Sequence, residues 1–259
     1  MEAADFDRWA LYYDLVHTGL PGEAAFYVKE ALNGEGAVLE VGCGTGRIAI
    51  AMALAGSEVT GLDFSPAMLQ LCRAKLEQAQ PVQGRLDTVQ ADMRAFDLGR
   101  RFQLVAMPYR TFMHLLTPRD QERCLACIRG HMAEDARLVF NVWAAPSAAV
   151  ARMTRSRAFQ PVDRYVLEAE ELVVEHACAV DVDWNRQRMI EQHYLRELGV
   201  DGAVVHETLL PLDRRWSRRE ELEALLPQAG LRVESVLGDF QGAAFGPESS
   251  ELIVVARAV

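Results

Sequence analysis

A glycine-rich run at residues 40–47, EVGCGTGR, is the part of the sequence whose residue types point most clearly to ligand binding. It follows an apolar segment, residues 37–41, that is typical of a buried strand, and it precedes a helical pattern that ends at Gly56. Glycines let the backbone turn at positive φ and let a ligand approach without a Cβ in the way. The free N–H groups at the start of the next helix favour a negatively charged group. The run therefore predicts a site for a small ligand that carries a carboxylate or a phosphate.

The spacing of the glycines indicates which of two kinds of glycine-rich loop this is. A dinucleotide loop of the form G-x-G-x-x-G would need glycine at position 47, which is Arg47 in this chain, and the third glycine is Gly46 instead. The resulting G-x-G-x-G, preceded by Glu40, resembles motif I of the class I S-adenosylmethionine-dependent methyltransferases. The run VLEVGCGTGRIAIAMA, residues 38–53, is similar to that motif almost throughout. The resemblance implies S-adenosylmethionine as the cofactor and methyl transfer as the activity, with no metal required.

The resemblance continues at the ends of the next two expected strands. Asp63 ends the segment 58–63, where the family places a carboxylate that accepts both ribose hydroxyls in a charge-assisted arrangement. Asp92 resembles the acidic residue that binds the adenine amino group, beside Met93 and its backbone N–H. Carboxyl ends of successive strands are where an open α/β sheet binds ligands. The cofactor-binding set that the resemblance implies comprises Tyr12, Glu40, Gly42, Cys43, Gly44, Arg47, Asp63, Phe64, Met68, Asp92, Met93 and Pro108.

The N-terminal tyrosines Tyr12 and Tyr13 lie just upstream of this core. They resemble a Tyr-Asp segment that folds over the cofactor as a lid in small-molecule members of the family. Either tyrosine can bind the methionyl carboxylate or line the substrate cavity, and aromatic packing in an amphipathic helix is the alternative. Arg47 is expected to pair with the same carboxylate or to face solvent.

The segment 109–115 resembles the loop after the fourth strand of sugar and other small-molecule N-methyltransferases, in which a histidine precedes a leucine. His114 matches that histidine and is predicted to be catalytic together with Tyr13. An imidazole that titrates near neutrality can take a proton from an amine or a hydroxyl. A packed or capping histidine is the open alternative. Tyr109 and Arg110 are expected to orient a polar or anionic substrate.

The elements that must position these residues alternate between strand and helix. Strands are expected at 37–41, 58–63, 85–92, 102–108 and 137–143, and two more, at 231–240 and 250–259, are expected to pair like a hairpin. Ser65, Thr117 and Ser217 are predicted N-caps of the intervening helices, with Glu220 completing a capping box. The pattern predicts an α/β fold with a doubly wound, mostly parallel seven-stranded sheet, the Rossmann-like methyltransferase fold.

The pattern changes between residues 151 and 213. A short helix or loop is expected at 151–160, followed by several strands within 164–212 that form an inserted antiparallel β lobe for the substrate. The expected division of the chain is therefore 1–150 for the lid helices and cofactor-binding core, 151–213 for the insertion, and 214–259 for the end of the core. His176, His193 and His206 fall in the insertion, where one of them can line the pocket, but they form no recognisable metal triad.

Composition restricts the partners. The formal net charge is −10, which disfavours nucleic acid because a basic surface must meet the phosphates. No apolar run reaches the length of a membrane span. Five cysteines without a disulfide pattern indicate a reducing cytoplasm.

These observations favour an S-adenosylmethionine-dependent methyltransferase that transfers the methyl group in line to an N or O nucleophile of a small-molecule acceptor, working as a monomer or homodimer. A covered cavity suits a metabolite better than a polymer. Two alternatives stay open at this point, a non-catalytic module that binds the cofactor and a nicotinamide-dependent oxidoreductase.

Overall fold

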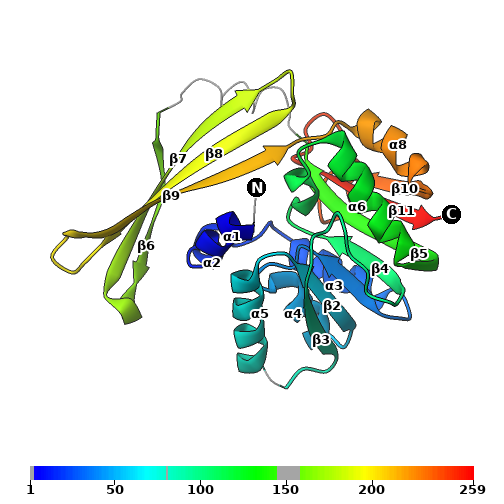
Figure 1. The fold of residues 1–259 in the computed structure, drawn as a ribbon, viewed down its shortest axis with the longest axis horizontal. Helices are drawn as coiled ribbons and strands as arrows, with labels where there is room; N and C mark the ends of the chain where they lie inside the picture. Colours follow the sequence, from blue (N-terminus) through cyan, green and yellow to red (C-terminus); the bar gives the residue numbers. More distant parts are fainter. Residues whose placement is uncertain (1–2, 80, 145–157) are drawn as a thin grey trace.

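The computed structural model describes residues 3–79, 81–144 and 158–259, and its larger sheet has seven strands (Figure 1). Their order is β10 (Leu231–Leu237), β11 (Glu251–Ala258), β5 (Met132–Trp143), β4 (Phe102–Met107), β1 (Val38–Val41), β2 (Glu58–Asp63) and β3 (Arg85–Gln90). Strands β1 to β5 run parallel, whereas β11 is antiparallel to both β5 and β10. The mostly parallel, seven-stranded fold and the hairpin-like final pair are thus confirmed.

The strand order reverses beside β1, which lies between β2 and β4. In an open α/β sheet, the crevice outside the carboxyl ends of the strands at such a reversal is where ligands bind. The segments that follow β1, β2 and β4 therefore share one edge of the sheet, and all three carry predicted site residues.

The helices around the sheet are α3 (Glu23–Leu32), α4 (Arg47–Leu54), α5 (Pro66–Gln78), α6 (Pro118–Gly130) and α8 (Arg219–Gln228). Two of the predicted N-caps are confirmed. Ser65 Oγ accepts a hydrogen bond from Met68 N at 3.1 Å, and Thr117 Oγ1 accepts one from Asp120 N at 3.1 Å.

The predicted cap of α8 is wrong by one position. The N-cap is Arg218, whose N–H donates to Glu221 Oε2 at 2.9 Å, so Glu221 and not Glu220 closes the first turn. Ser217 is unavailable because its hydroxyl accepts hydrogen bonds from Gln121 Nε2 and Arg215 Nη1, at 3.3 and 3.2 Å.

A second sheet is inserted between β5 and α8, and we call it the small sheet. It consists of β6 (Gln160–Leu167), β7 (Leu172–Asp183), β8 (Arg188–Leu198) and β9 (Val204–Arg215), all antiparallel to their neighbours. This confirms the inserted antiparallel lobe. The helix or loop expected at 151–160 lies mostly outside the described residues, and the exact division of the chain stays a prediction.

The N-terminal helices α1 (Ala3–Trp9) and α2 (Tyr13–Val16), here called the lid helices, lie between the small sheet and α5 (Figure 1). Trp9 Nε1 donates to Pro211 O of β9 at 3.1 Å. Toward the core, Asp7 accepts from Ser65 Oγ and Asp14 accepts from Thr45 Oγ1, each at 2.6 Å. The lid helices therefore join the small sheet to the cofactor-binding edge of the core.

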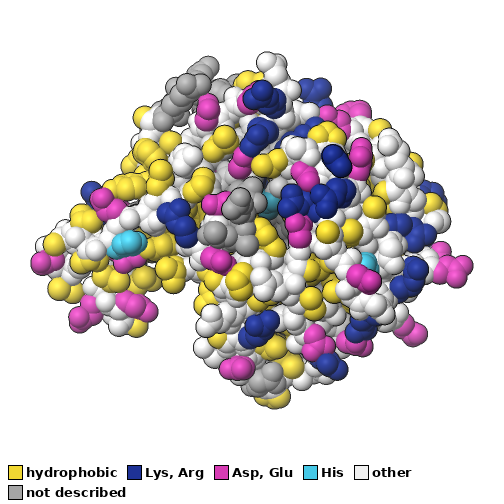
Figure 2. Space-filling view, in the orientation of Figure 1, with side chains coloured by type: hydrophobic (Ala, Val, Ile, Leu, Met, Phe, Trp, Pro, Cys, Tyr) yellow, Lys and Arg dark blue, Asp and Glu magenta, His cyan; other side chains and the backbone are white. Residues whose placement is uncertain are grey.

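Apolar side chains pack on both faces of the large sheet, and a third cluster joins the lid helices to α5 and the small sheet. Figure 2 shows hydrophobic side chains on the surface of the small sheet. In β6, Val162 and Val166 are more than half exposed. Within the described part of the chain, no helix combines the length and the apolar character needed to cross a membrane.

Candidate active site

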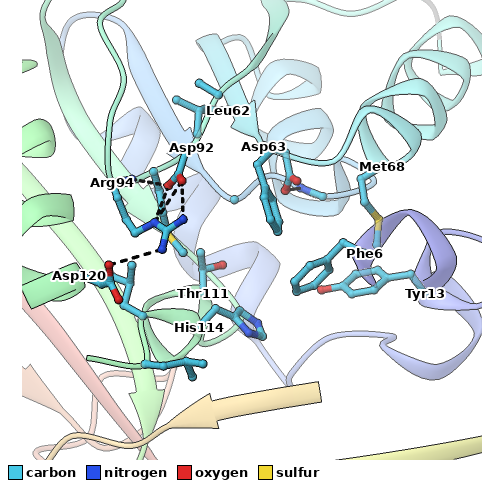
Figure 3. Close-up of a pocket in the computed structure, with 17 residues that line it drawn as sticks. Phe6, Tyr13, Leu62, Asp63, Met68, Asp92, Arg94, Thr111, His114 and Asp120 are labelled. Atoms are coloured by element: carbon cyan, nitrogen blue, oxygen red, sulfur yellow. Dashed lines mark hydrogen bonds and ion pairs between the residues drawn. The ribbon is translucent and has the colours of Figure 1, made fainter. Parts of the chain in front are cut away.

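A pocket opens at the edge of the sheet where β1, β2, β3 and β4 end, beneath the lid helices (Figure 3). Seventeen residues line it, namely Phe6, Tyr13, Gly42, Gly44, Leu62, Asp63, Phe64, Met68, Ala91, Asp92, Met93, Arg94, Thr111, His114, Leu115, Leu116 and Asp120. Nine of these are residues that the sequence predicts for the site, so the pocket lies where the site was expected.

The glycine loop forms the floor of the pocket. Gly44 has φ +54, and a Cβ added there would meet only the Tyr13 ring, at 3.9 Å, so the space above the loop is open to a ligand. Gly46 has φ +87 and starts α4, where a Cβ would lie well inside contact distance of Cys72 Sγ. The loop therefore needs glycine for its backbone angles and for its close packing on α5.

Asp63 connects the loop to the end of β2. Its carboxylate accepts hydrogen bonds from Gly44 N at 2.8 Å and from Ser65 N at 3.0 Å. Burial raises the pKa of this carboxyl, and these backbone N–H groups oppose the rise. The contacts hold the carboxylate at the pocket wall, in the position predicted for a ribose-binding acid.

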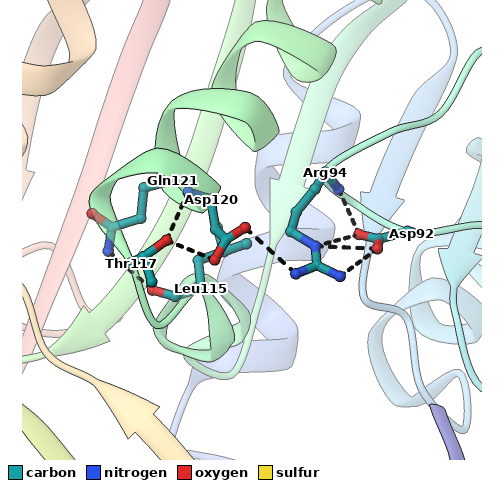
Figure 4. Close-up of polar contacts among 6 residues, drawn as sticks. All are labelled: Asp92, Arg94, Leu115, Thr117, Asp120 and Gln121. Carbon is teal, nitrogen blue, oxygen red and sulfur yellow. Dashed lines mark hydrogen bonds and ion pairs between the residues drawn. The ribbon is translucent and has the colours of Figure 1, made fainter. Parts of the chain in front are cut away.

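Asp92, at the opposite wall, is paired with a residue that the sequence analysis did not include (Figure 4). Arg94 Nη2 lies 2.6 Å from Asp92 Oδ2, and Arg94 Nη1 lies 3.4 Å from Asp120 Oδ1 at the start of α6. Hydrogen bonding to Arg94 lowers the pKa of Asp92, so its carboxylate stays charged. The signal that could have identified Arg94 is its position two residues after the acid.

Tyr13 and His114 both line the pocket, and His114 belongs to the short helix η1 (Thr111–His114). The His114 ring meets the edge of Phe6 at 5.2 Å between centroids, and its Nδ1 is buried without a partner among the described residues. Burial, followed by the charge of Arg214, lowers the pKa of His114 to about 3. Burial raises the pKa of Tyr13. Both side chains are therefore uncharged at neutral pH, and the expectation of an imidazole titrating near neutrality is wrong.

Several predicted residues are engaged elsewhere. Tyr12 donates its hydroxyl hydrogen bond to Glu197 of β8 instead of reaching the pocket. Arg47 does not line the pocket, and its partly exposed guanidinium forms an ion pair with the buried Glu23 at 2.7 Å. These expectations are corrected because each side chain has a closer partner from a distant part of the chain.

The loop after β4 is likewise held by the core. Arg110 forms an ion pair with Glu251 of β11, so its expected role of orienting the substrate is not supported. Tyr109 N donates to Glu23 Oε1 at 2.7 Å, and its ring lies 4.8 Å from the Arg47 guanidinium carbon.

The remaining three predicted cofactor residues lie behind the pocket wall. Glu40 and Cys43 are buried under the glycine loop, and burial raises the pKa of Glu40. Pro108 shapes the turn into η1 by accepting a hydrogen bond from Thr111 Oγ1 at 2.7 Å.

The donor set of the pocket fits S-adenosylmethionine. The pocket lining combines the apolar side chains of Leu62, Phe64 and Met68 with the acceptors Asp63 and Asp92, which is the combination that an adenosyl group requires. Gly44 leaves room for the polar amino-acid end. Within the described residues, no group of three or more His, Cys, Asp or Glu side chains is arranged to hold a metal ion.

Comparisons with known proteins agree with this geometry. Residues 38–135 match the family model described as "Methyltransferase domain". The chain is 28% identical to the dTDP-3-amino-3,6-dideoxy-alpha-D-glucopyranose N,N-dimethyltransferase of Streptomyces fradiae, over 89% of this chain and 86% of that protein. The CcbJ methyltransferase of Streptomyces caelestis superposes with a TM-score of 0.74 and 27% identity, over 92% of this chain and 89% of the other.

A third likeness shows the fold alone. CalS10 of Micromonospora echinaspora, an amino pentose methyltransferase solved with S-adenosylmethionine bound, has a TM-score of 0.69 and 24% identity, covering 92% of this chain and 90% of that one.

The fold and the pocket together define a Rossmann-like methyltransferase. Because residues 38–135 match a methyltransferase domain and about nine tenths of the chain is similar to named methyltransferases, the protein is an S-adenosylmethionine-dependent methyltransferase. Neither the non-catalytic module nor the nicotinamide-dependent oxidoreductase gains support from these findings.

Proposed function

We propose that this enzyme methylates an amine nitrogen of a small, polar metabolite. The observation that carries the proposal is the pair of uncharged side chains, Tyr13 and His114, that line a pocket closed by the lid helices. The Streptomyces fradiae relative is named for methylating an amino sugar on nitrogen, which favours nitrogen over oxygen. A small acceptor suits a pocket covered by inserted elements better than a polymer does.

We assign the cofactor contacts as follows. Asp63 accepts hydrogen bonds from the ribose hydroxyls, Asp92 faces the adenine amino group, and Met68 packs against the ring. The glycine loop, with Gly42 and Gly44, receives the amino-acid end. Because Arg94 already binds Asp92, the guanidinium must share this carboxylate with the adenine or move toward Asp120.

The bound cofactor supplies a methyl group already activated by a sulfonium, so a C–N bond forms as the C–S bond breaks. The protein's part is to orient the nucleophile, and such positioning supplies roughly 7–11 kcal/mol of rate enhancement. His114 and Tyr13 present hydrogen-bonding groups without charge. A buried, uncharged site favours the free amine over the ammonium, so the acceptor is deprotonated before attack. His114 acts here as a positioning group, because its low pKa makes it a weak proton acceptor.

The experiment that tests this proposal is a comparison of acceptors with labelled S-adenosylmethionine. Purified enzyme is incubated with amino sugars, with hydroxylated metabolites that lack an amine, and with RNA and peptides. We expect labelled product only from the amines. Transfer only to RNA or protein, or to hydroxyl oxygen, would refute the assignment.

The proposal also covers the cellular compartment, the partners and the oligomeric state of the enzyme. All five cysteines are free, which favours a reducing cytoplasm. The acidic net charge disfavours nucleic acid as a partner. Whether it works as a monomer or a homodimer stays a prediction that sedimentation of the purified enzyme tests.

A further inference from the structure

A second group of polar side chains lies beside the cofactor pocket, where the lid helices, the core and the small sheet meet. It consists of His17 after α2, His114 in η1, Glu191 and His193 in β8, and Arg214 in β9, and we call it the histidine cluster. His114 also lines the pocket, so the cluster is continuous with it.

Ring contacts and ion pairs hold these residues together. The His17 ring lies 4.8 Å from the Tyr13 ring and 6.0 Å from the His193 ring, between centroids. His193 Nδ1 lies 2.9 Å from Nε2 of His176, which stacks on it. Arg214 forms an ion pair with Glu191, whose carboxylate lies 3.6 Å from His193 Nε2. Because Tyr13 lines the pocket and contacts His17, the cluster adjoins the pocket.

The cluster contains an unusual concentration of buried polar atoms without a hydrogen-bond partner. Eight such side-chain atoms occur among the described residues, and four of them are in the cluster, namely His17 Nε2, His114 Nδ1, His193 Nε2 and Arg214 Nε. Of these, His193 Nε2 has the Glu191 carboxylate 3.6 Å away, beyond hydrogen-bond distance. A buried polar atom left unpaired costs about 1–3 kcal/mol, and native proteins keep few of them. Their collection in one place, next to the pocket, indicates a ligand that pairs with them.

The charges in the cluster limit what that ligand can be. Burial opposes ionisation of Glu191, but Arg214 and His193 lower the pKa of this carboxyl to about 2, so it stays charged and balances Arg214. Burial, followed by His193 and Arg214, lowers the pKa of His17 to about 3. His17 and His114 are therefore neutral near pH 7. A buried site without excess charge penalises an ionic group and favours hydroxyls, which both donate and accept.

We infer that the histidine cluster is the part of the acceptor site that binds hydroxyl groups, with His17 as a specificity-determining residue. The part of the acceptor enclosed with the reacting amine is then uncharged and hydroxylated, and any phosphate or carboxylate it carries lies outside the cluster. This inference rests on the proposed methylation of a small amine, whose acceptor it describes more closely.

A matched pair of variants tests whether the cluster is built for a ligand. His131 is a buried histidine outside the cluster with both ring nitrogens bonded, Nδ1 to Cys127 O at 2.8 Å and Nε2 to Leu98 N at 2.9 Å. We expect H17F to raise the Tm by about 2–4 °C, because it removes an unpaired polar atom from an aromatic setting. H131F should lower the Tm. A Tm of H17F below that of the wild type would overturn the inference.

Binding measurements test the ligand chemistry directly. The enzyme saturated with S-adenosylhomocysteine is titrated with glucosamine, with the hydroxyl-free cyclohexylamine, and with the anionic glucosamine phosphate. We expect glucosamine to bind at least about tenfold more tightly than either, a difference of about 1.4 kcal/mol. H17F should abolish that preference while leaving the affinity for S-adenosylhomocysteine within about twofold, whereas H206Q, at an exposed position of β9, should change neither.

The results separate this inference from the proposed reaction. Equal binding of glucosamine and cyclohexylamine, or a preference that survives in H17F, would overturn the role of the cluster. A preference for glucosamine without methylation of any amine would instead support the cluster and refute the proposed reaction.

Discussion

At the residue scale, the two acids of the pocket differ in how they are held. Asp63 is fixed by backbone N–H groups of the glycine loop and of the residue that caps α5. Asp92 is fixed by Arg94, a side chain that can change rotamer. The carboxylate of Asp63 is therefore already fixed in place for the ribose contact that we propose.

Replacing Asp63 should accordingly weaken cofactor binding. We expect D63N to raise the Kd for S-adenosylhomocysteine by about 10–100-fold, since a hydrogen bond to a charged group contributes about 1.5–3 kcal/mol. Isothermal titration calorimetry measures the change. D87N serves as the control, because Asp87 pairs with Arg85 at an exposed part of β3. Unchanged affinity in D63N would contradict the assigned role.

The sequence placed Asp63 and Asp92 at the pocket because each lies at or just after the end of a strand, which is a local feature. Tyr12, Arg47 and Arg110 were misplaced for the opposite reason. Their partners, listed in the same order, are Glu197, Glu23 and Glu251, which lie in other elements. Only the folded chain reveals which carboxylate captures a given side chain.

At the element scale, the β1–α4 junction depends on a tight fit between the glycine loop and α5. Gly46 begins α4 at φ +87, with Cys72 directly against it, and Gly56 follows the same helix at φ +107 with nothing within 4 Å of an added Cβ. An alanine at either position would adopt an unfavourable φ angle, but only an alanine at Gly46 would also press against a neighbouring side chain. Comparing the two substitutions therefore separates the free-energy cost of the backbone angle from that of packing.

We expect G46A to lower the free energy of unfolding by about 2–5 kcal/mol, from backbone strain of about 1–2 and overpacking of about 1–3 kcal/mol. G56A, which carries the strain alone, should cost about 1–2 kcal/mol. Urea denaturation of both variants measures the difference. Equal losses would show that the close packing on α5 contributes nothing.

Strands and caps were predictable where the pattern was local. Buried apolar runs identified the strands of the core, and Ser65 and Thr117, each followed by proline, identified the starts of two helices. The N-cap of α8 could not be predicted in this way, because the hydroxyl of Ser217 accepts a hydrogen bond from Gln121 of another helix. The break between the lid helices at Ala10–Tyr12 could not be predicted either, because this segment contains no glycine or proline.

At the scale of the whole molecule, the site is assembled from three regions. The large sheet supplies the cofactor pocket, the lid helices cover it, and the small sheet contributes His193 and Arg214 to the histidine cluster beside it. No spacing in the sequence relates His17 to His193, so the histidine cluster could not be predicted. The expectation that a histidine of the insertion lines the pocket is wrong, because none of His176, His193 and His206 is a lining residue, and His193 lies beside the pocket in the histidine cluster.

Buried neutral histidines make the stability of the whole enzyme depend on pH. The pKa values of His17 and His114 are lowered to about 3 and that of His176 to about 4, chiefly by burial, against about 6.5 in the unfolded chain. Between these pKa values the unfolded chain binds more protons than the folded chain. The free energy of unfolding therefore has its full value above pH 6.5 and falls as the pH is lowered toward 3.

When the pH is lowered from 7 to 5, we therefore expect each of these histidines to lower the free energy of unfolding by about 2 kcal/mol. Urea denaturation at both pH values tests this. H17F should lose about 2 kcal/mol less than the wild type over the same interval. The same loss in both proteins would show that His17 is not held neutral by the fold.

The most direct test of the central claim is calorimetric titration of the purified enzyme with S-adenosylhomocysteine and, separately, with NAD⁺. The pocket between Asp63 and Asp92 predicts saturable binding of S-adenosylhomocysteine at one site per chain, which D63N weakens, and no binding of NAD⁺. Absence of binding by S-adenosylhomocysteine, or tighter binding of NAD⁺, would contradict the account.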